Sequence, residues 1–189
     1  MDNIKLILCS KSPRRIELIR KLKYPFIVYP VKINENIGIK NPVKLVKKLA
    51  LEKALMGVKN FDNGIAIGVD TVVVYNKEII GKPNNINNAK TILKKLSGTV
   101  HKVYTGVALI DCCSGKKIVD YEVTKVKMRK LTDIEINVFA KKHIDKAGSY
   151  AVQEKNDAVV TKIYGDYYNV VGFPIKKIKK MLRQLIKKL

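Results

Sequence analysis

Short apolar segments rich in β-branched residues alternate with helical segments along the whole sequence. This alternation constrains the fold strongly, because buried strands need helices packed beside them. The apolar pattern predicts strands over residues 4–9, 26–31, 65–75, 78–80, 100–110, 117–130, 158–164 and 167–171. Helices are predicted over residues 14–22, 42–58, 85–96, 132–143 and 174–189.

Capping residues mark where three of these helices begin. Ser12-Pro13 and Asn41-Pro42 each place a capping residue before a proline at the first helical position. Thr132, followed three residues later by Glu135, has the pattern of a capping box.

Turns between the predicted strands decide the type of sheet. Asn76-Lys77 and Ser114-Gly115 each connect two strands closely, and a further hairpin is predicted around Gly165-Asp166. The 189 residues contain no linker, repeat or low-complexity segment. We therefore expect one α/β domain over residues 1–189, with a mixed β-sheet and flanking helices.

The chain carries a formal net charge of +22, which is a common feature of proteins that bind polyanions. However, 33 of the 38 basic residues are lysine, and lysine, asparagine and isoleucine share A- and T-rich codons. Nucleotide bias is therefore the favoured explanation for much of this charge, and binding to a polyanion is the alternative. The last predicted helix is basic and amphipathic, which fits a membrane or polyanion surface, but packing of its apolar side on the sheet is the favoured interpretation.

No apolar run reaches the roughly 18 residues of a membrane helix, and the N-terminal segment resembles a strand more than a signal peptide. The three cysteines are odd in number and two of them are adjacent, which argues against a disulfide framework. We expect a cytoplasmic protein that does not bind membranes.

The segment Ser10-Lys11-Ser12-Pro13-Arg14-Arg15 lies between a predicted strand and a helix start. Hydroxyls, cations and the free N–H groups of a helix start all favour a phosphate there. The alternative is a capped surface helix with solvated arginines.

Asp70-Thr71 lies inside an apolar strand, where a carboxylate is costly unless it is paired or binds a metal. The alternative is a structural hydrogen bond at a strand end. Lys82, between Gly81 and Pro83, is either a positioned cation or an ordinary turn lysine. Glu35 and Lys53 carry no distinguishing signal of their own. The sequence contains no zinc-ligand spacing and no Ser-His-Asp or Walker-type pattern.

Taken in order, the motifs resemble the Maf family of nucleoside triphosphate pyrophosphatases. The ordered set is specific although each motif alone is weak. The motifs are LCSKSPRRIEL at 8–18, GVDTVV at 68–73, GKP at 81–83, LSG at 96–98 with His101, TG at 105–106, DKAG at 145–148 with Tyr150 and Gln153, and GD at 165–166 with Asn169, Gly172 and Pro174.

The resemblance implies a fold like that of the inosine triphosphate pyrophosphatases, with two lobes around a cleft. It implies hydrolysis of a nucleoside triphosphate to the monophosphate and pyrophosphate with Mg²⁺ or Mn²⁺. Arg14, Thr71 and Gln153 resemble the branch that acts on dTTP and UTP rather than on 7-methyl-GTP.

The resemblance also implies roles for individual residues. Asp70 would be the general base or a metal ligand, and Glu35 would help to hold the metal. The expected phosphate contacts are Ser10, Ser12, Arg14, Lys53 and Lys82. Thr71 and Gln153 would contact the base.

Four positions depart from the family pattern: Cys9 replaces alanine, Asn34 replaces the first of two acidic residues, Glu154 replaces glycine and Phe173 replaces leucine. The competing hypothesis is a weakly catalytic member that acts as a basic nucleic-acid or division-associated binding protein. The scarcity of aromatic residues argues against a dedicated RNA binder. A homodimer would be an ordinary assembly for such a chain.

Overall fold

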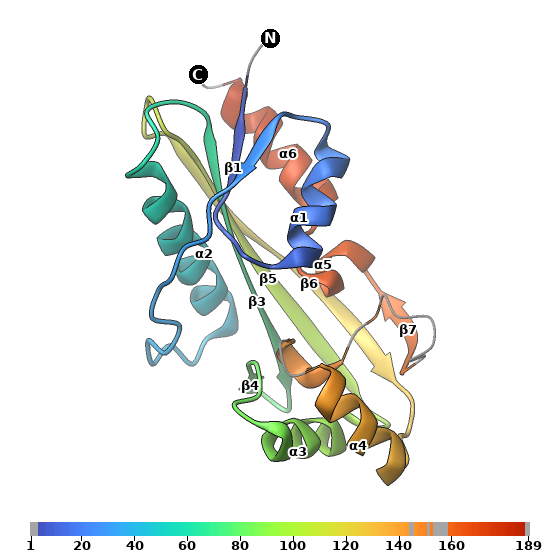
Figure 1. Ribbon diagram of the computed structural model, residues 1–189. Helices are drawn as coiled ribbons and strands as arrows, with labels where there is room; N and C mark the ends of the chain where they lie inside the picture. The colour runs from blue at the N-terminus through green and yellow to red at the C-terminus, as the bar shows by residue number, and fades with distance from the viewer. Residues whose placement is uncertain (1–3, 144–145, 151, 153–158, 188–189) are drawn as a thin grey trace. The chain divides into compact units, whose positions relative to one another are not determined.

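The computed structural model describes residues 4–143, 146–150, 152 and 159–187 (Figure 1). Its strands are β1 (Leu6–Leu8), β2 (Phe26–Val28), β3 (Ile65–Tyr75), β4 (Glu78–Ile80), β5 (Val100–Asp111), β6 (Lys117–Met128) and β7 (Val160–Tyr164). Its α-helices are α1 (Pro13–Ile19), α2 (Pro42–Val58), α3 (Ile86–Leu96), α4 (Asp133–Lys142), α5 (Tyr167–Val171) and α6 (Ile175–Ile186). Two 3-10 helices, η1 (Arg20–Leu22) and η2 (Ala147–Ser149), complete the described elements.

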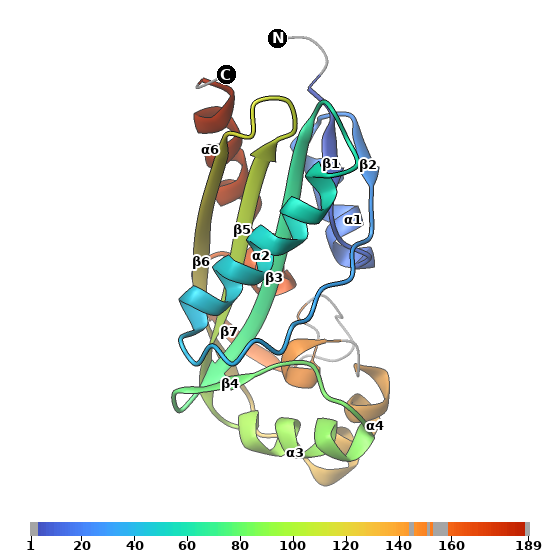
Figure 2. The same ribbon diagram turned by 90° about the vertical axis from the view of Figure 1, so that its left-hand side faces the viewer.

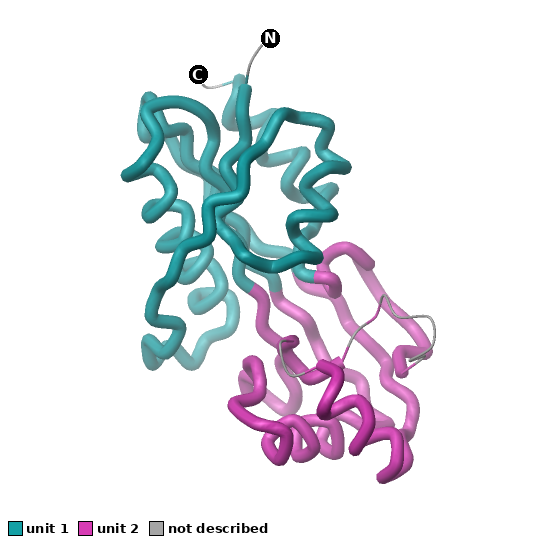
Figure 3. Tube along the Cα trace, in the orientation of Figure 1, with its two compact units in different colours: residues 1–70, 105–122, 172–189 teal, residues 71–104, 123–171 magenta. Residues whose placement is uncertain are grey.

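The strands form a mixed sheet in the order β2-β1-β3-β5-β6-β7, and β4 pairs with β3. β1 runs parallel to β2 and β3, whereas β3 pairs with β4, and β6 with β7, in antiparallel fashion. The prediction of an α/β fold with a mixed sheet is therefore confirmed. The chain divides into two compact units (Figure 3), residues 1–70, 105–122 and 172–189 in the first and residues 71–104 and 123–171 in the second.

In the first unit, α2 lies on one face of the sheet and α1 and α6 lie on the other (Figures 1 and 2). Asn41 caps α2 by accepting a hydrogen bond from the backbone N–H of Lys44, as its sequence predicted. Small residues let α2 approach the strands closely: Ala50 and Ala54 of α2 pack with Ala108 and Ile110 of β5. This part of α2 therefore lies directly against β5.

The apolar side of α6 is buried in the same unit. Its buried residues are Ile175, Ile178, Met181, Leu182 and Leu185. Packing against the body of the protein is therefore the correct interpretation of this basic amphipathic helix. Among the described residues, no helix has the length and apolar character needed to cross a membrane.

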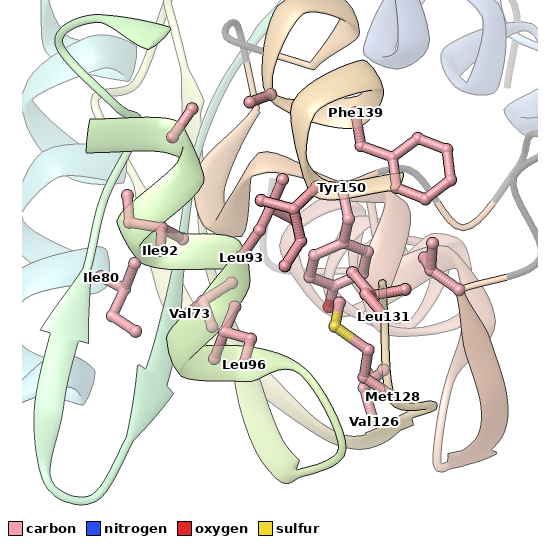
Figure 4. Packing of buried hydrophobic residues seen from close by; sticks show 14 of the residues in the cluster. Val73, Ile80, Ile92, Leu93, Leu96, Val126, Met128, Leu131, Phe139 and Tyr150 are labelled. Carbon is pink, nitrogen blue, oxygen red and sulfur yellow. The ribbon is translucent and has the colours of Figure 1, made fainter. Parts of the chain in front are cut away.

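The second unit has its own core (Figure 4). Leu93 and Leu96 of α3 are buried there together with Phe139 of α4 and Tyr150. Thr132 and Glu135 form the expected capping box at the start of α4.

The structure differs from several sequence predictions. The predicted hairpin around Gly165-Asp166 is wrong, because only its first segment is a strand, β7. Residues 167–171 form the short helix α5 instead of a strand. Tyrosine and valine favour strands only where they can pack against neighbouring strands. Here the Asp166 carboxylate accepts a hydrogen bond from the N–H of Tyr168, and a helical turn begins at this point. α1 ends at Ile19 and continues as η1. The side chain of Ser12 makes no capping hydrogen bond, although Ser12 is the residue that precedes α1.

His101 lies in the core of the second unit, where it is 1% exposed. Its Nε2 atom lies 2.7 Å from the Tyr150 hydroxyl oxygen. Burial lowers the pKa of His101 from 6.5 to about 4, because the interior disfavours a charged ring.

This buried imidazole predicts a pH-dependent stability. Between these two pKa values the unfolded chain binds a proton that the folded chain does not, so stability is lost as the pH falls below 6.5. We expect His101 to account for a loss of about 2 kcal/mol between pH 7 and pH 5. Urea unfolding at both pH values measures it, with His101→Gln as the non-titrating control. Parallel pH dependences in the two proteins would contradict the prediction.

Candidate active site

Asp70 is buried near the middle of β3, with 6% of its surface exposed. The ammonium group of Lys53 in α2 donates a 2.7 Å hydrogen bond to Asp70 Oδ1 and a 2.8 Å hydrogen bond to Glu35 Oε1. Glu35 lies in the segment between β2 and α2. Three separate elements of the first unit thus bring two carboxylates and one ammonium group together.

The close packing of α2 on β3 places Lys53. Gly68 lies two residues before Asp70, and a Cβ atom at this position would come within 1.9 Å of the Ala50 carbonyl oxygen and 2.6 Å of the Ala54 nitrogen. Only glycine leaves room for this contact. The helix turn that carries Lys53 therefore rests directly on the strand that carries Asp70.

The segment after β1 forms a small hydrogen-bonded structure around Ser10. The hydroxyl oxygen of Ser10 accepts 3.3 Å hydrogen bonds from the N–H of Ser12 and from Arg15 Nη1. Ser10 is buried, whereas Ser12 and Arg14 are half-buried. The predicted residues Ser10, Ser12 and Arg14 therefore share the first unit with Glu35, Lys53 and Asp70.

Arg15, which the sequence predicted only as one of the cations of the segment 10–15, connects three parts of the first unit. Its Nη1 donates a 2.8 Å hydrogen bond to the carbonyl oxygen of Val69, and its Nε donates a 3.0 Å bond to the carbonyl oxygen of Gly172. Burial lowers the pKa of this guanidinium, while the charges of Asp70 and Glu35 act in the opposite direction. Arg15 therefore fixes the backbone immediately before Asp70. Its proximity to Arg14 in the sequence was the only available signal.

We expect Arg15→Lys to destabilise the protein by about 2 kcal/mol, because an ammonium group cannot reproduce the forked contacts and leaves buried carbonyl oxygens unsatisfied. Urea unfolding measures this change. Arg183→Lys on the exposed side of α6 is the matched control and should leave stability nearly unchanged. Equal free energies of unfolding in the two variants would show that the Arg15 hydrogen bonds do not stabilise the protein by this amount.

Two further predicted residues, Thr71 and Lys82, belong to the second unit. Thr71 is half-buried in β3, and Lys82 is exposed in the segment between β4 and α3. The N–H of Gly148 donates a 3.3 Å hydrogen bond to the carbonyl oxygen of Gly81, next to Lys82. Gln153 and Glu154 lie outside the described residues.

The donor set around Lys53 is chemically suited to a hard cation. Glu35 and Asp70 supply carboxylate oxygens, which Mg²⁺ and Mn²⁺ prefer, and Mg²⁺ is commonly held by one or two carboxylates together with substrate phosphates. Within the described ranges, no group of three or more His, Cys, Asp or Glu side chains gathers as a metal site. The Asn34 carboxamide accepts a 3.0 Å hydrogen bond from the N–H of Asn36, so it is engaged within its own loop.

The chain is similar to known proteins over nearly its whole length. The dTTP/UTP pyrophosphatase of Elusimicrobium minutum is 40% identical over 181 residues, covering 96% of this chain and 98% of that protein. The protein of the same name from Alkaliphilus oremlandii is 46% identical over 182 residues and covers 94% of each chain.

The fold is similar to that of the Staphylococcus aureus Ham1 protein, with a TM-score of 0.55 at 12% sequence identity over 95% of this chain and 98% of that one. The family model for Maf-like proteins matches residues 5–185. The chain therefore belongs to the Maf family.

Proposed function

We propose that this protein hydrolyses dTTP and UTP to the nucleoside monophosphate and pyrophosphate. The names of relatives that match over nearly their full length support the substrates and the reaction. The observation that carries the proposal is the buried carboxylate of Asp70, hydrogen-bonded to Lys53 in the same unit as Glu35 and the Ser10 segment.

Asp70 is assigned as the general base that accepts a proton from the attacking water. Its burial and its place in a strand restrict its motion, which suits a group that must hold water in line with a phosphorus atom. Arg15 acts as a positioning residue, because it holds the Val69 carbonyl oxygen immediately before the base.

Glu35 and Asp70 are the residues that would hold Mg²⁺ or Mn²⁺. The bound metal would supply neutralisation of charge on the phosphate oxygens. Lys53, Arg14 and Lys82 would neutralise further phosphate charge, and the hydroxyls of Ser10 and Ser12 would donate hydrogen bonds to phosphate oxygens.

Thr71 and Gln153 are assigned to recognition of the base, because a carboxamide can pair with the donor and acceptor edge of uracil or thymine. We also propose a cytoplasmic location, which the three unpaired thiols and the nucleotide substrates support.

A substrate panel tests this proposal. The purified protein is assayed with dTTP, UTP, CTP, GTP and ATP in the presence of Mg²⁺ or Mn²⁺, and kcat/KM is determined for pyrophosphate release. We expect dTTP and UTP to have the highest values, and Gln153→Glu to lower the ratio of the UTP rate to the GTP rate. A preference for another base, or an unchanged ratio in the variant, would contradict the assignment of the base contacts.

A further inference from the structure

We propose that Lys53 stands in for the divalent cation in the free protein, so that metal binding requires the ammonium group to leave Asp70. This inference deepens the proposed function and rests on it for the metal-dependent reaction. Its test is a binding measurement that does not depend on turnover.

The first support is geometric. Glu35 Oε1 and Asp70 Oδ1 lie 2.8 and 2.7 Å from the same atom, Lys53 Nζ. The two carboxylates come from a loop and a strand, and they converge on this one cationic point. A metal ion bound by both carboxylates would need the same space between them, so the ion and the ammonium group exclude one another.

The second support is electrostatic. Asp70 and Glu35 both act to raise the pKa of the Arg15 guanidinium, so the charges of two cations already act on these two carboxylates. A divalent ion added to this set would leave an excess of positive charge. The side chains of Lys53 and Asp70 are only 10% and 9% exposed, whereas that of Glu35 is 49% exposed. Excess charge in a partly desolvated site is strongly unfavourable.

The third support identifies which cation moves. Arg15 is held by hydrogen bonds to the carbonyl oxygens of Val69 and Gly172. Lys53 carries its ammonium group on a flexible four-carbon stem, and its hydrogen bonds in the described part of the chain go to the two carboxylates alone. A triphosphate offers this ammonium group new acceptors, so nucleotide binding promotes metal binding and the reverse.

Lys53→Met tests the inference through Mn²⁺ affinity, measured without nucleotide by titration calorimetry or by the electron paramagnetic resonance of free Mn²⁺. Methionine keeps an unbranched side chain but removes the competing charge. We expect at least about tenfold tighter Mn²⁺ binding than in the unmodified protein. Mn²⁺ should also raise the Tm of this variant more than that of the unmodified protein, because a ligand that binds the folded chain more tightly stabilises it more.

Lys48→Met is the matched control, since it removes one charge from the same helix at a side chain that is 54% exposed and pairs with Glu52. It should leave Mn²⁺ affinity nearly unchanged. Adding Asp70→Asn to Lys53→Met should remove the gain, because the second ligand is lost. Equal Mn²⁺ affinities in Lys53→Met and the unmodified protein would overturn the inference.

A crystal structure of the unmodified protein grown with Mn²⁺ provides a test that does not depend on the folding of a variant. We expect Mn²⁺ between Glu35 and Asp70, with Lys53 Nζ beyond hydrogen-bond distance of Asp70. Mn²⁺ bound to Asp70 with the Lys53 contact intact would overturn the inference. Neither result depends on pyrophosphate release, so failure of the proposed function and failure of this inference remain distinguishable.

Discussion

Turnover of dTTP is expected to fall at least about a hundredfold when Asp70 is replaced by asparagine, because a general base of this kind contributes two to four orders of magnitude. The carboxamide has nearly the same shape as the carboxylate but cannot accept the proton of the attacking water. It also binds a divalent metal more weakly, so both roles assigned to Asp70 are lost. Steady-state pyrophosphate release measures the effect.

The fold should survive this substitution. Lys53 keeps its hydrogen bond to Glu35, and the carboxamide oxygen introduced by Asp70→Asn would still accept a hydrogen bond from Lys53. Asp111→Asn is the matched control, since Asp111 is also buried in the first unit but accepts hydrogen bonds from Ser114 in a turn. We expect near wild-type turnover in the control. More than a few per cent of wild-type activity in the Asp70 variant would reject its role as the base.

Gly68→Ala should produce the largest change in stability. The added methyl group would come within 1.9 Å of the Ala50 carbonyl oxygen, and neither the backbone of α2 nor that of β3 can yield without losing packing. We expect a loss of about 3 kcal/mol in the free energy of unfolding. Turnover should fall with it, because a displaced α2 moves Lys53 out of the position from which it is proposed to neutralise phosphate charge.

The control for this prediction is Gly81→Ala. A Cβ atom at Gly81 would meet no heavy atom within 4 Å, and the stability of that variant should be close to that of the unmodified protein. Urea unfolding of both variants provides the comparison. Equal stability of Gly68→Ala and Gly81→Ala would show that the close contact between α2 and β3 does not require glycine at position 68.

Local signals in the sequence predicted the elements that their own residues determine. Asn41 and Thr132 cap the helices that follow them, because a side-chain oxygen and a nearby N–H are all that a cap requires. Residues 167–171 were predicted wrongly, since β-propensity depends on the surface that receives the strand. At this point the Asp166 carboxylate accepts a hydrogen bond from the N–H of Tyr168, which favours a helical turn.

The candidate site was predictable only in part. Asp70 is notable in the sequence because a charge interrupts an apolar strand, but Glu35 and Lys53 gained meaning only from the family resemblance. Their contact depends on close packing between α2 and β3, which no local pattern encodes. The contacts of Arg15 were not predicted for the same reason, since its partners Val69 and Gly172 are distant in sequence.

Phosphorus-31 NMR of the products that the unmodified protein forms from dTTP with Mg²⁺ tests the proposed pyrophosphatase reaction most directly. Water activated by Asp70 is expected to cleave between the α- and β-phosphates. We therefore expect dTMP and pyrophosphate in equal amounts, with no dTDP. Formation of dTDP and inorganic phosphate, or no consumption of dTTP or UTP with either Mg²⁺ or Mn²⁺, would contradict the proposed reaction.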